Sequence, residues 1–271
     1  VMNELASRGY EGIGSDIKET YSGIQDGTAV TTMPYVPMDI TDASSVEKVL
    51  TDAKPDVVVH CAAWTAVDLA EDEDKKDIVK AVNATGTKNI ADVCKKLDCK
   101  MVYISTDYVF DGQGTRPWEP DDPVVKPLNV YGQEKYDGEV AVEKYAPKHY
   151  IVRIAWVFGL NGKNFIKTML NLGKTHDTLT VVDDQIGTPT YTYDLARLLV
   201  DMLEKEEYGK YHATNEGGYI SWYDFTVEIM KQAAKYNDKY SKVEVLPVGS
   251  DMYPAKAKRP SNSRMDKSKL K

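Results

Sequence analysis

Two short apolar runs constrain the fold of this chain more than any other feature: DVVVHCAA at 56–63 and KMVYIST at 100–106. Continuous β-branched runs of this kind are typical of strands that are buried on both faces of a parallel sheet. A helix predicted over 78–97 separates them, and helices and strands keep alternating as far as residue 157. This alternation predicts βαβ units. We therefore expect an α/β fold built on a doubly wound parallel sheet.

The pattern loosens beyond residue 159. Shorter elements follow, with helices predicted over 164–172, 192–204 and 221–236 and strands over 179–182, 210–215 and 242–248. They predict a smaller α+β lobe beside the sheet, with some pieces returning to the sheet. A chain of 271 residues is long enough for one large domain or two smaller ones.

Composition and charge argue against two classes of partner. The net charge of −8 argues against a nucleic-acid surface, which is normally basic. No apolar run reaches the 18 residues of a membrane span, and the chain does not start with a signal peptide. The three cysteines and four histidines lack metal-ligand spacing, so no metal site is assigned. We expect reduced, packing cysteines in a cytoplasmic protein.

Several polar or small residues come directly after predicted strands, where an open parallel sheet binds its ligands. Asp16 ends a short strand predicted over 11–17 and could hydrogen-bond a ribose 2′-hydroxyl while repelling a 2′-phosphate. Asp39, in a second short strand over 35–40, could approach an adenine edge. Each of these carboxylates could instead start a turn or cap a helix. Ala62 and Ala63 are small enough for a backbone to pass close to a ligand, or are simple core residues.

The glycine-rich turn that marks a dinucleotide site is not found between a first strand and a first helix. Residues 1–8 resemble the second half of a helix that ends at Gly9. Either an upstream strand and phosphate loop lie outside the sequence, or the chain does not bind a dinucleotide. The residues at the strand ends favour the first alternative.

A strand end and a helix together place groups that can transfer a proton. Tyr131 and Lys135 lie one turn apart on a helix predicted over 129–145, after a strand that ends in Ser105 and Thr106. A nearby ammonium favours the tyrosinate and so lowers the pKa of the phenol. A hydroxyl of the strand end could hold a carbonyl oxygen against that phenol. The alternative is a core aromatic residue beside a solvated lysine.

Two further residues are candidates for substrate binding. Trp156 follows a strand at the expected rim of the site, although tryptophans are more often core residues. Arg259 belongs to a basic group near the end of the sequence that could attract a phosphate or could simply be solvated; its other members are Lys163, Lys167, Lys256 and Lys258.

Seven stretches keep the order and spacing of a known family across nearly the whole chain. The chain resembles the extended short-chain dehydrogenase/reductases, and within them the dTDP-4-dehydrorhamnose reductases. The stretches are CAAWTAVDLAE at 61–71, VNATGTKNIA at 82–91, ISTDYVFDGQG at 104–114, PLNVYGQEK at 127–135, VRIAWVFG at 152–159, DDQIGTPTYTYDLA at 183–196 and KRP at 258–260. The resemblance implies a Rossmann-type sheet and reduction of a nucleotide-sugar ketone.

The resemblance also implies a role for each matching residue. Thr106, Tyr131 and Lys135 match the catalytic trio. The matches to cofactor contacts, together with Asp16 and Ser105 from the strand-end reasoning, are Asp39, Ile40, Ala62, Ala63, Thr65, Tyr131 and Lys135. The positions that match those facing the sugar are Thr106, Asp107, Tyr131 and Trp156, and Arg259 of the basic group is a further candidate for substrate binding. Residues 1–157 and 185–205 would form the dinucleotide-binding domain, and 158–184 and 206–271 the substrate-binding lobe.

The implied cofactor is NADPH or NADH, and the implied assembly is a monomer or a homodimer. Some family members form a dimer linked by Mg²⁺ through glutamates, which cannot be placed in this sequence. Two rival functions stay open. One is a dinucleotide-binding regulatory subunit without turnover. The other is a nucleotide-sugar epimerase or dehydratase, since Asp107 follows Thr106 where a dehydratase carries an acid.

Overall fold

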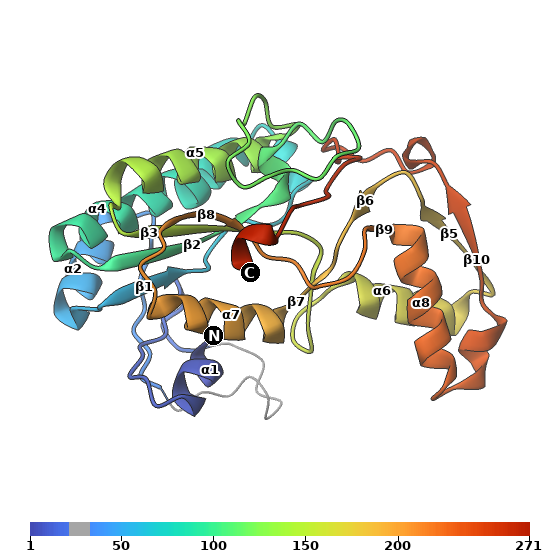
Figure 1. Ribbon diagram of the computed structural model, residues 1–271, viewed down its shortest axis with the longest axis horizontal. Helices are drawn as coiled ribbons and strands as arrows, with labels where there is room; N and C mark the ends of the chain where they lie inside the picture. Colours follow the sequence, from blue (N-terminus) through green and yellow to red (C-terminus); the bar gives the residue numbers. More distant parts are fainter. Residues whose placement is uncertain (22–32) are drawn as a thin grey trace.

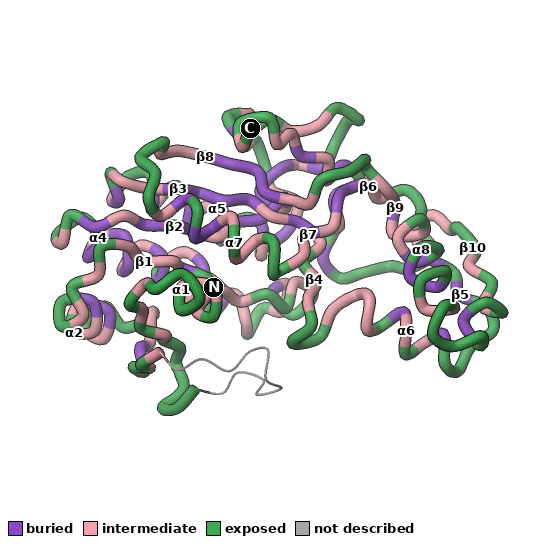
Figure 2. The backbone as a smooth tube through the Cα atoms, turned by 60° about the horizontal axis from the view of Figure 1, so that its bottom comes forward, coloured by how far each residue is buried: buried purple, intermediate pink, exposed green. Residues whose placement is uncertain are grey.

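The computed structural model describes residues 1–21 and 33–271. Figure 1 shows a parallel sheet with helices on both of its faces and a smaller lobe to one side. The most deeply buried strands lie at the centre of the sheet (Figure 2). None of the described helices is both long and apolar enough to cross a membrane.

The main sheet has four parallel strands in the order β1-β2-β3-β8. They are β1 (Val57–His60), β2 (Lys100–Thr106), β3 (His149–Ile154) and β8 (Gly209–His212). Successive residues of a strand point to opposite faces. Thus Met101 and Tyr103 enter one core and Val102 enters the other.

Both faces of the sheet are covered by helices, which confirms the doubly wound fold. The first core lies under α2 (Ala43–Ala53), α4 (Thr87–Leu97) and α5 (Val130–Tyr145). The second lies under α7 (Thr192–Leu203), against which the short α1 (Met2–Ser7) packs.

The helix predicted over 78–97 is present but is interrupted. It consists of α3 (Lys76–Lys80), a π-helical segment η2 (Ala81–Gly86) and α4. Single turns of π-helix inside α-helices often occur at functional sites. Here the segment contains Asn83, whose buried side chain bonds to another loop, as described below.

The two short strands predicted over 11–17 and 35–40 are reduced to one bridge between Gly14 and Tyr35. The Gly14 amide donates to the Pro34 carbonyl at 2.8 Å, and the Val36 amide donates to the Gly14 carbonyl at 3.0 Å. The prediction was wrong about their extent. Pro34 has no N–H to donate, so a regular ladder cannot extend through it, although the Met38 amide, beyond Pro37, still donates to the Asp16 carbonyl at 2.9 Å.

The smaller lobe has its own core, formed by α6 (Phe165–Thr175), β5 (Thr178–Val182), α8 (Trp222–Ala234) and β10 (Glu244–Val248). Its β5 and β10 pair in parallel. Two small pairs stand apart from these sheets: β4 (Val157–Phe158) with β7 (Thr190–Tyr191), and β6 (Ile186–Gly187) with β9 (Ile220–Ser221).

Part of the predicted lobe returns to the main sheet. The strand β8 pairs with β3, so that Tyr150 lies opposite Gly209 and Arg153 opposite His212. The 3₁₀ turn η6 (Ser268–Leu270) contacts β8, and Leu270 packs on the second core. The remaining 3₁₀ turns are η1 (Leu69–Glu71), η3 (Asp107–Val109), η4 (Asp238–Lys242) and η5 (Ser250–Met252).

Candidate active site

The carboxyl end of β2 presents two adjacent buried polar residues, Thr106 and Asp107. The Thr106 hydroxyl accepts from the Tyr108 amide at 3.2 Å and so caps η3, and it donates to the Asp107 carboxylate at 3.1 Å. The Ser263 hydroxyl donates to the other Asp107 oxygen at 2.5 Å. Burial raises the pKa of Asp107 to about 6. Asp107 therefore links the strand end to a segment far along the chain.

Tyr131 lies in the first turn of α5, facing that strand end. The Asn129 side chain caps the helix by accepting from the Gly132 amide at 2.8 Å. The Tyr131 ring meets the Tyr108 ring edge-on, with 5.7 Å between centroids. Burial raises the pKa of Tyr131 to about 12, and the Thr106 hydroxyl acts against this rise. The phenol is therefore protonated at neutral pH, and the lowered pKa expected from the sequence is not found.

Lys135 is buried one helical turn below Tyr131, so the interpretation as a solvated lysine is wrong. Its ammonium donates to the Ile104 carbonyl at 2.7 Å and lies 4.1 Å from the centroid of the Tyr103 ring. Burial lowers the pKa of Lys135 to about 7, although the Glu139 carboxylate acts in the opposite direction. A small change of surroundings thus decides whether this lysine is charged.

The loop after β1 is held in place by Asn83, which sequence reasoning missed. The Trp64 amide donates to the Asn83 side-chain oxygen at 2.8 Å, and the Asn83 amide group donates to the Trp64 carbonyl at 3.1 Å. These two hydrogen bonds fix the backbone on either side of Trp64. Ala63 is half-buried and Thr65 is exposed. Ala62 is also exposed. The signal for Asn83 was its place in the VNATGT stretch.

A backbone hydrogen bond holds the stretch around Asp16 beside the stretch that carries Asp39 and Ile40. The Met38 amide donates to the Asp16 carbonyl at 2.9 Å, which places Asp16 beside the residue before Asp39. Both carboxylates also make local turn contacts: that of Asp16 accepts from the next amide at 2.7 Å, and that of Asp39 from Thr41 at 2.9 Å. The Ile40 carbonyl accepts from the Asn89 side chain of α4 at 2.9 Å.

Ser105 occupies a different place from the other candidates. Its buried hydroxyl donates to Glu139 of α5 at 2.6 Å. Glu139 in turn forms a fully buried ion pair with Arg153 of β3, at 2.7 Å. Neither Glu139 nor Arg153 was predicted from the sequence.

Trp156 follows β3 in a conformation that is rare for a bulky residue, with φ of 52°. Its ring stacks on Trp222 of α8, with 3.6 Å between centroids. Gly187 lies against the same ring, because a Cβ there would come within 3.0 Å of it. Strained residues of this kind cluster at ligand sites. Because it follows β3 of the main sheet and stacks on α8 of the smaller lobe, Trp156 lies where the sheet meets the lobe.

Arg259 comes to the site from the far end of the chain. Its guanidinium pairs with Asp68 at 2.7 Å, and the Asp68 carboxylate also accepts from the Ala257 amide at 3.0 Å. The neighbouring Lys258 carbonyl accepts from the Asn129 side chain at 2.9 Å. Arg259 is therefore held close to the start of α5.

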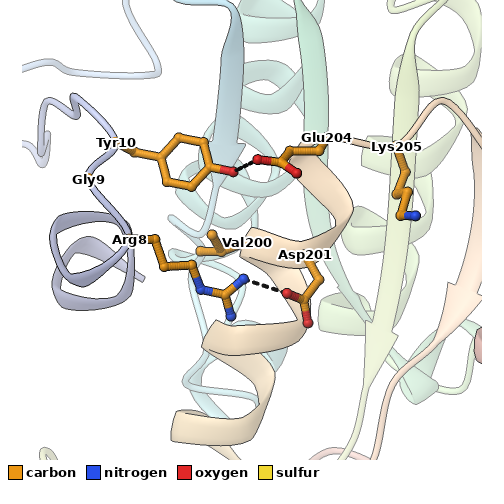
Figure 3. A pocket seen from close by; sticks show the side chains of 7 residues that line it. All are labelled: Arg8, Gly9, Tyr10, Val200, Asp201, Glu204 and Lys205. Atoms are coloured by element: carbon orange, nitrogen blue, oxygen red, sulfur yellow. Dashed lines mark hydrogen bonds and ion pairs between the residues drawn. The ribbon is translucent and has the colours of Figure 1, made fainter.

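A separate surface cavity of about 510 Å³ lies between α1 and α7 (Figure 3). Its two carboxylates are both engaged, Asp201 by Arg8 and Glu204 by the Tyr10 hydroxyl. None of its lining residues is a predicted site residue. The residues with candidate chemistry instead gather at the carboxyl end of β2.

The described residues fit the nicotinamide half of a dinucleotide. Small residues follow β1, and a phenol and an ammonium face the neighbouring strand end, which is where such sheets bind cofactors. Within residues 1–21 and 33–271, no glycine-rich turn joins a strand of the main sheet to a helix. Over the same ranges, no group of three or more His, Cys, Asp or Glu residues could hold a metal ion.

One close contact suggests a test of how α5 is seated. A Cβ on Gly132 would lie 2.2 Å from the Tyr108 carbonyl oxygen. We expect Gly132→Ala to lower the free energy of unfolding by about 1–3 kcal/mol, since α5 would have to move away. Urea denaturation measures this change. Gly218→Ala is the control because nothing lies within 4 Å of its Cβ position. Equal midpoints for both variants would contradict the close packing.

The chain matches proteins of known activity along most of its length. The family described as "RmlD substrate binding domain" matches residues 8–271. The dTDP-4-dehydrorhamnose reductase of Aggregatibacter actinomycetemcomitans is 38% identical over 247 residues, which are 89% of this chain and 83% of that protein.

Two solved structures agree with that match. A dTDP-4-dehydrorhamnose reductase from Clostridium acetobutylicum is 40% identical, with a TM-score of 0.81 over 94% of this chain and 89% of that one. The enzyme of the same name from Bacillus anthracis, solved with NADP, is 35% identical, with a TM-score of 0.82 over 95% of this chain and 91% of that one.

Proposed function

This chain belongs to the RmlD family, that of the dTDP-4-dehydrorhamnose reductases, and from this membership we propose its reaction. It reduces the C4 ketone of dTDP-4-dehydro-L-rhamnose with NAD(P)H and gives dTDP-L-rhamnose. The observation that best supports this reaction is the approach of a protonated Tyr131 phenol to the Thr106 hydroxyl at the end of β2.

The proposed roles follow from the state of each group. NAD(P)H supplies the hydride when it is bound. The Thr106 hydroxyl would hydrogen-bond the C4 oxygen and hold it against Tyr131. Because its pKa is raised to about 12, Tyr131 carries the proton that the developing alkoxide needs. Lys135, when charged, would stabilise the tyrosinate that remains and bind the nicotinamide ribose. General acid catalysis of this kind contributes about 10²–10⁴-fold to the rate.

Other residues would hold the two ligands. The loop Ala62–Ala63 and Thr65 would contact the cofactor, together with Asp39 and Ile40. The substrate would lie between the sheet and the lobe, with Trp156 against the sugar and Arg259 near the diphosphate. These placements support a division into a dinucleotide-binding domain and a substrate-binding lobe. We also propose that the protein acts in the cytoplasm, as a monomer or a homodimer.

The reaction is tested by mixing the protein with dTDP-4-dehydro-L-rhamnose and NADPH or NADH. Loss of the absorbance of the reduced cofactor, together with formation of dTDP-L-rhamnose, is the expected result. A regulatory subunit would bind the cofactor without turnover. An epimerase or a dehydratase would consume no net cofactor, and either result would reject the proposal.

The choice between the two cofactors can be tested at Asp16, whose side chain is exposed. If its carboxylate faces the ribose, it repels the 2′-phosphate of NADPH. We then expect Asp16→Asn to raise kcat/KM for NADPH relative to NADH by about tenfold, which corresponds to roughly 1.4 kcal/mol. Glu19→Gln, another exposed acid nearby, is the control. An unchanged ratio in Asp16→Asn would place Asp16 away from the ribose.

A further inference from the structure

A row of polar residues crosses three strands of the sheet beneath α5. Ser105 of β2 lies opposite Arg153 of β3, and Arg153 lies opposite His212 of β8. All three are buried. Ser105 and Arg153 lie on the same face of the sheet as Tyr103 and Ile151, which come two residues earlier on the same strands and belong to the first core. Buried charges are rare unless they are paired, so this row needs a partner.

Glu139 of α5 is that partner. One of its oxygens accepts from Ser105 at 2.6 Å and from the Arg153 Nε at 2.8 Å, and the other accepts from a terminal Arg153 nitrogen at 2.7 Å. Arg153 also donates to the Pro120 carbonyl at 3.0 Å. Glu139 and Arg153 are both fully buried. Both oxygens of the Glu139 carboxylate thus accept hydrogen bonds, and the donors come from two strands, β2 and β3.

This network is joined to the candidate catalytic pair through the helix. Glu139 lies one turn after Lys135 and two turns after Tyr131, on the same helix face. Lys135 bonds to the Ile104 carbonyl and Glu139 bonds to the Ser105 hydroxyl. Two consecutive residues of β2 therefore fix the register of α5, immediately before Thr106.

The charged and titratable groups around Lys135 are few. Tyr131 and Glu139 lie one turn before and one turn after it on α5. Cys61 faces it from the loop after β1, and His60 and Tyr103 face it from the sheet. Burial lowers the pKa of His60 to about 3, so His60 is neutral. Glu139 is therefore the carboxylate that acts on Lys135 within the part of the chain that the structure describes.

We propose that Glu139, held by Arg153 and Ser105, is a positioning residue that sets α5 on β2 and supplies the negative charge that keeps Lys135 cationic. This inference rests on the proposed function, in which a charged Lys135 assists Tyr131. Without the Glu139 charge, Lys135 loses its proton at a lower pH. Activity then falls at a pH where the wild type is still active.

The test compares pH profiles of kcat/KM. In Glu139→Gln we expect the alkaline limb of the kcat/KM profile to move down by about one pH unit or more, so that the ratio of activities at pH 6 and pH 8 changes by at least about fivefold. Glu139→Asp keeps the charge and should keep the position of the limb, even if kcat falls. Glu143→Gln is the matched control, because Glu143 lies one turn further along α5 and pairs with Lys210 near the surface, at 2.8 Å.

Because Glu139→Gln leaves the Arg153 charge buried without its full partner, it could fail to fold. The double variant Glu139→Met/Arg153→Leu removes both charges and decides the question in that case, since such apolar replacements are often tolerated. If Glu139 and Arg153 only stabilise the fold, the folded double variant should keep the wild-type pH profile of kcat/KM. Our inference predicts the shifted limb.

A second readout does not depend on turnover. The titration of the Lys135 side chain, followed by NMR and assigned with Lys135→Met, should move to lower pH in Glu139→Gln and stay in place in Glu143→Gln. An unshifted titration and an unshifted limb in a folded variant would overturn the inference. If the wild type itself does not reduce the sugar, the proposed function fails, while the titration still tests the charge effect.

Discussion

Tyr131→Phe is expected to lower kcat by about 10²–10⁴-fold, because the variant retains the ring but lacks the proton that the alkoxide requires. The phenol proton is available in the wild type, since burial raises the pKa of Tyr131 to about 12. The edge-on contact with Tyr108 involves the ring and remains in the variant. We therefore expect a thermal midpoint close to that of the wild type.

Steady-state reduction of dTDP-4-dehydro-L-rhamnose measures this loss. Tyr136→Phe is the control, since Tyr136 lies on the same helix and is outside the proposed machinery. A KM near that of the wild type would show that the lost hydroxyl acts in the reaction step. Turnover within a few-fold of the wild type in Tyr131→Phe would remove Tyr131 from the mechanism.

Lys135→Met is expected to lower turnover and to raise stability at the same time. The ammonium is buried, and its pKa is lowered from 10.5 to about 7. Below pH 7 both the folded and the unfolded chain carry this proton, so the full cost of burying the charge opposes folding. Between about pH 7 and 10.5 the unfolded chain binds more protons, so stability rises with pH across that window.

Methionine has a similar length and carries no charge to bury. We expect Lys135→Met to raise the free energy of unfolding by about 1–3 kcal/mol at pH 6, after allowing for the lost bond to the Ile104 carbonyl. The gain should shrink towards pH 10, and kcat should fall by at least about 10²-fold. Urea titrations at the two pH values and the reductase assay measure both effects. A variant that is less stable than the wild type at pH 6 would contradict the buried cation.

The candidate proton-transfer residues could be identified from the sequence because their arrangement is local. Tyr131 and Lys135 share a helix face through their spacing, and Thr106 ends a strand whose apolar run is unmistakable. The rule that ligands bind beyond strand ends then brings the two elements together. The family resemblance assigned the roles, and the matches to known reductases support the same family.

The residues that hold this arrangement were not predictable in the same way. Arg153 and Glu139 meet only because β3 pairs with β2 in one register and α5 crosses both. Nothing in the apolar pattern indicates that a strand will bury an arginine. The extent of the short strands around Gly14 also depended on what they pair with, since proline interrupts the ladder that their composition suggested.

The contacts near the end of the chain have a consequence for biosynthesis. A ribosome releases Tyr131 and Lys135 long before it reaches Lys258 and Ser263. Yet the cap of α5 is tied to the Lys258 carbonyl, and Asp107 is tied to the Ser263 hydroxyl. A nascent chain therefore carries the proposed acid–base pair before the contacts that hold it in place can form. Translation past Ser263 is needed to complete the candidate active site, so we expect chains truncated before Lys258 to be catalytically incompetent even with every proposed reacting group present.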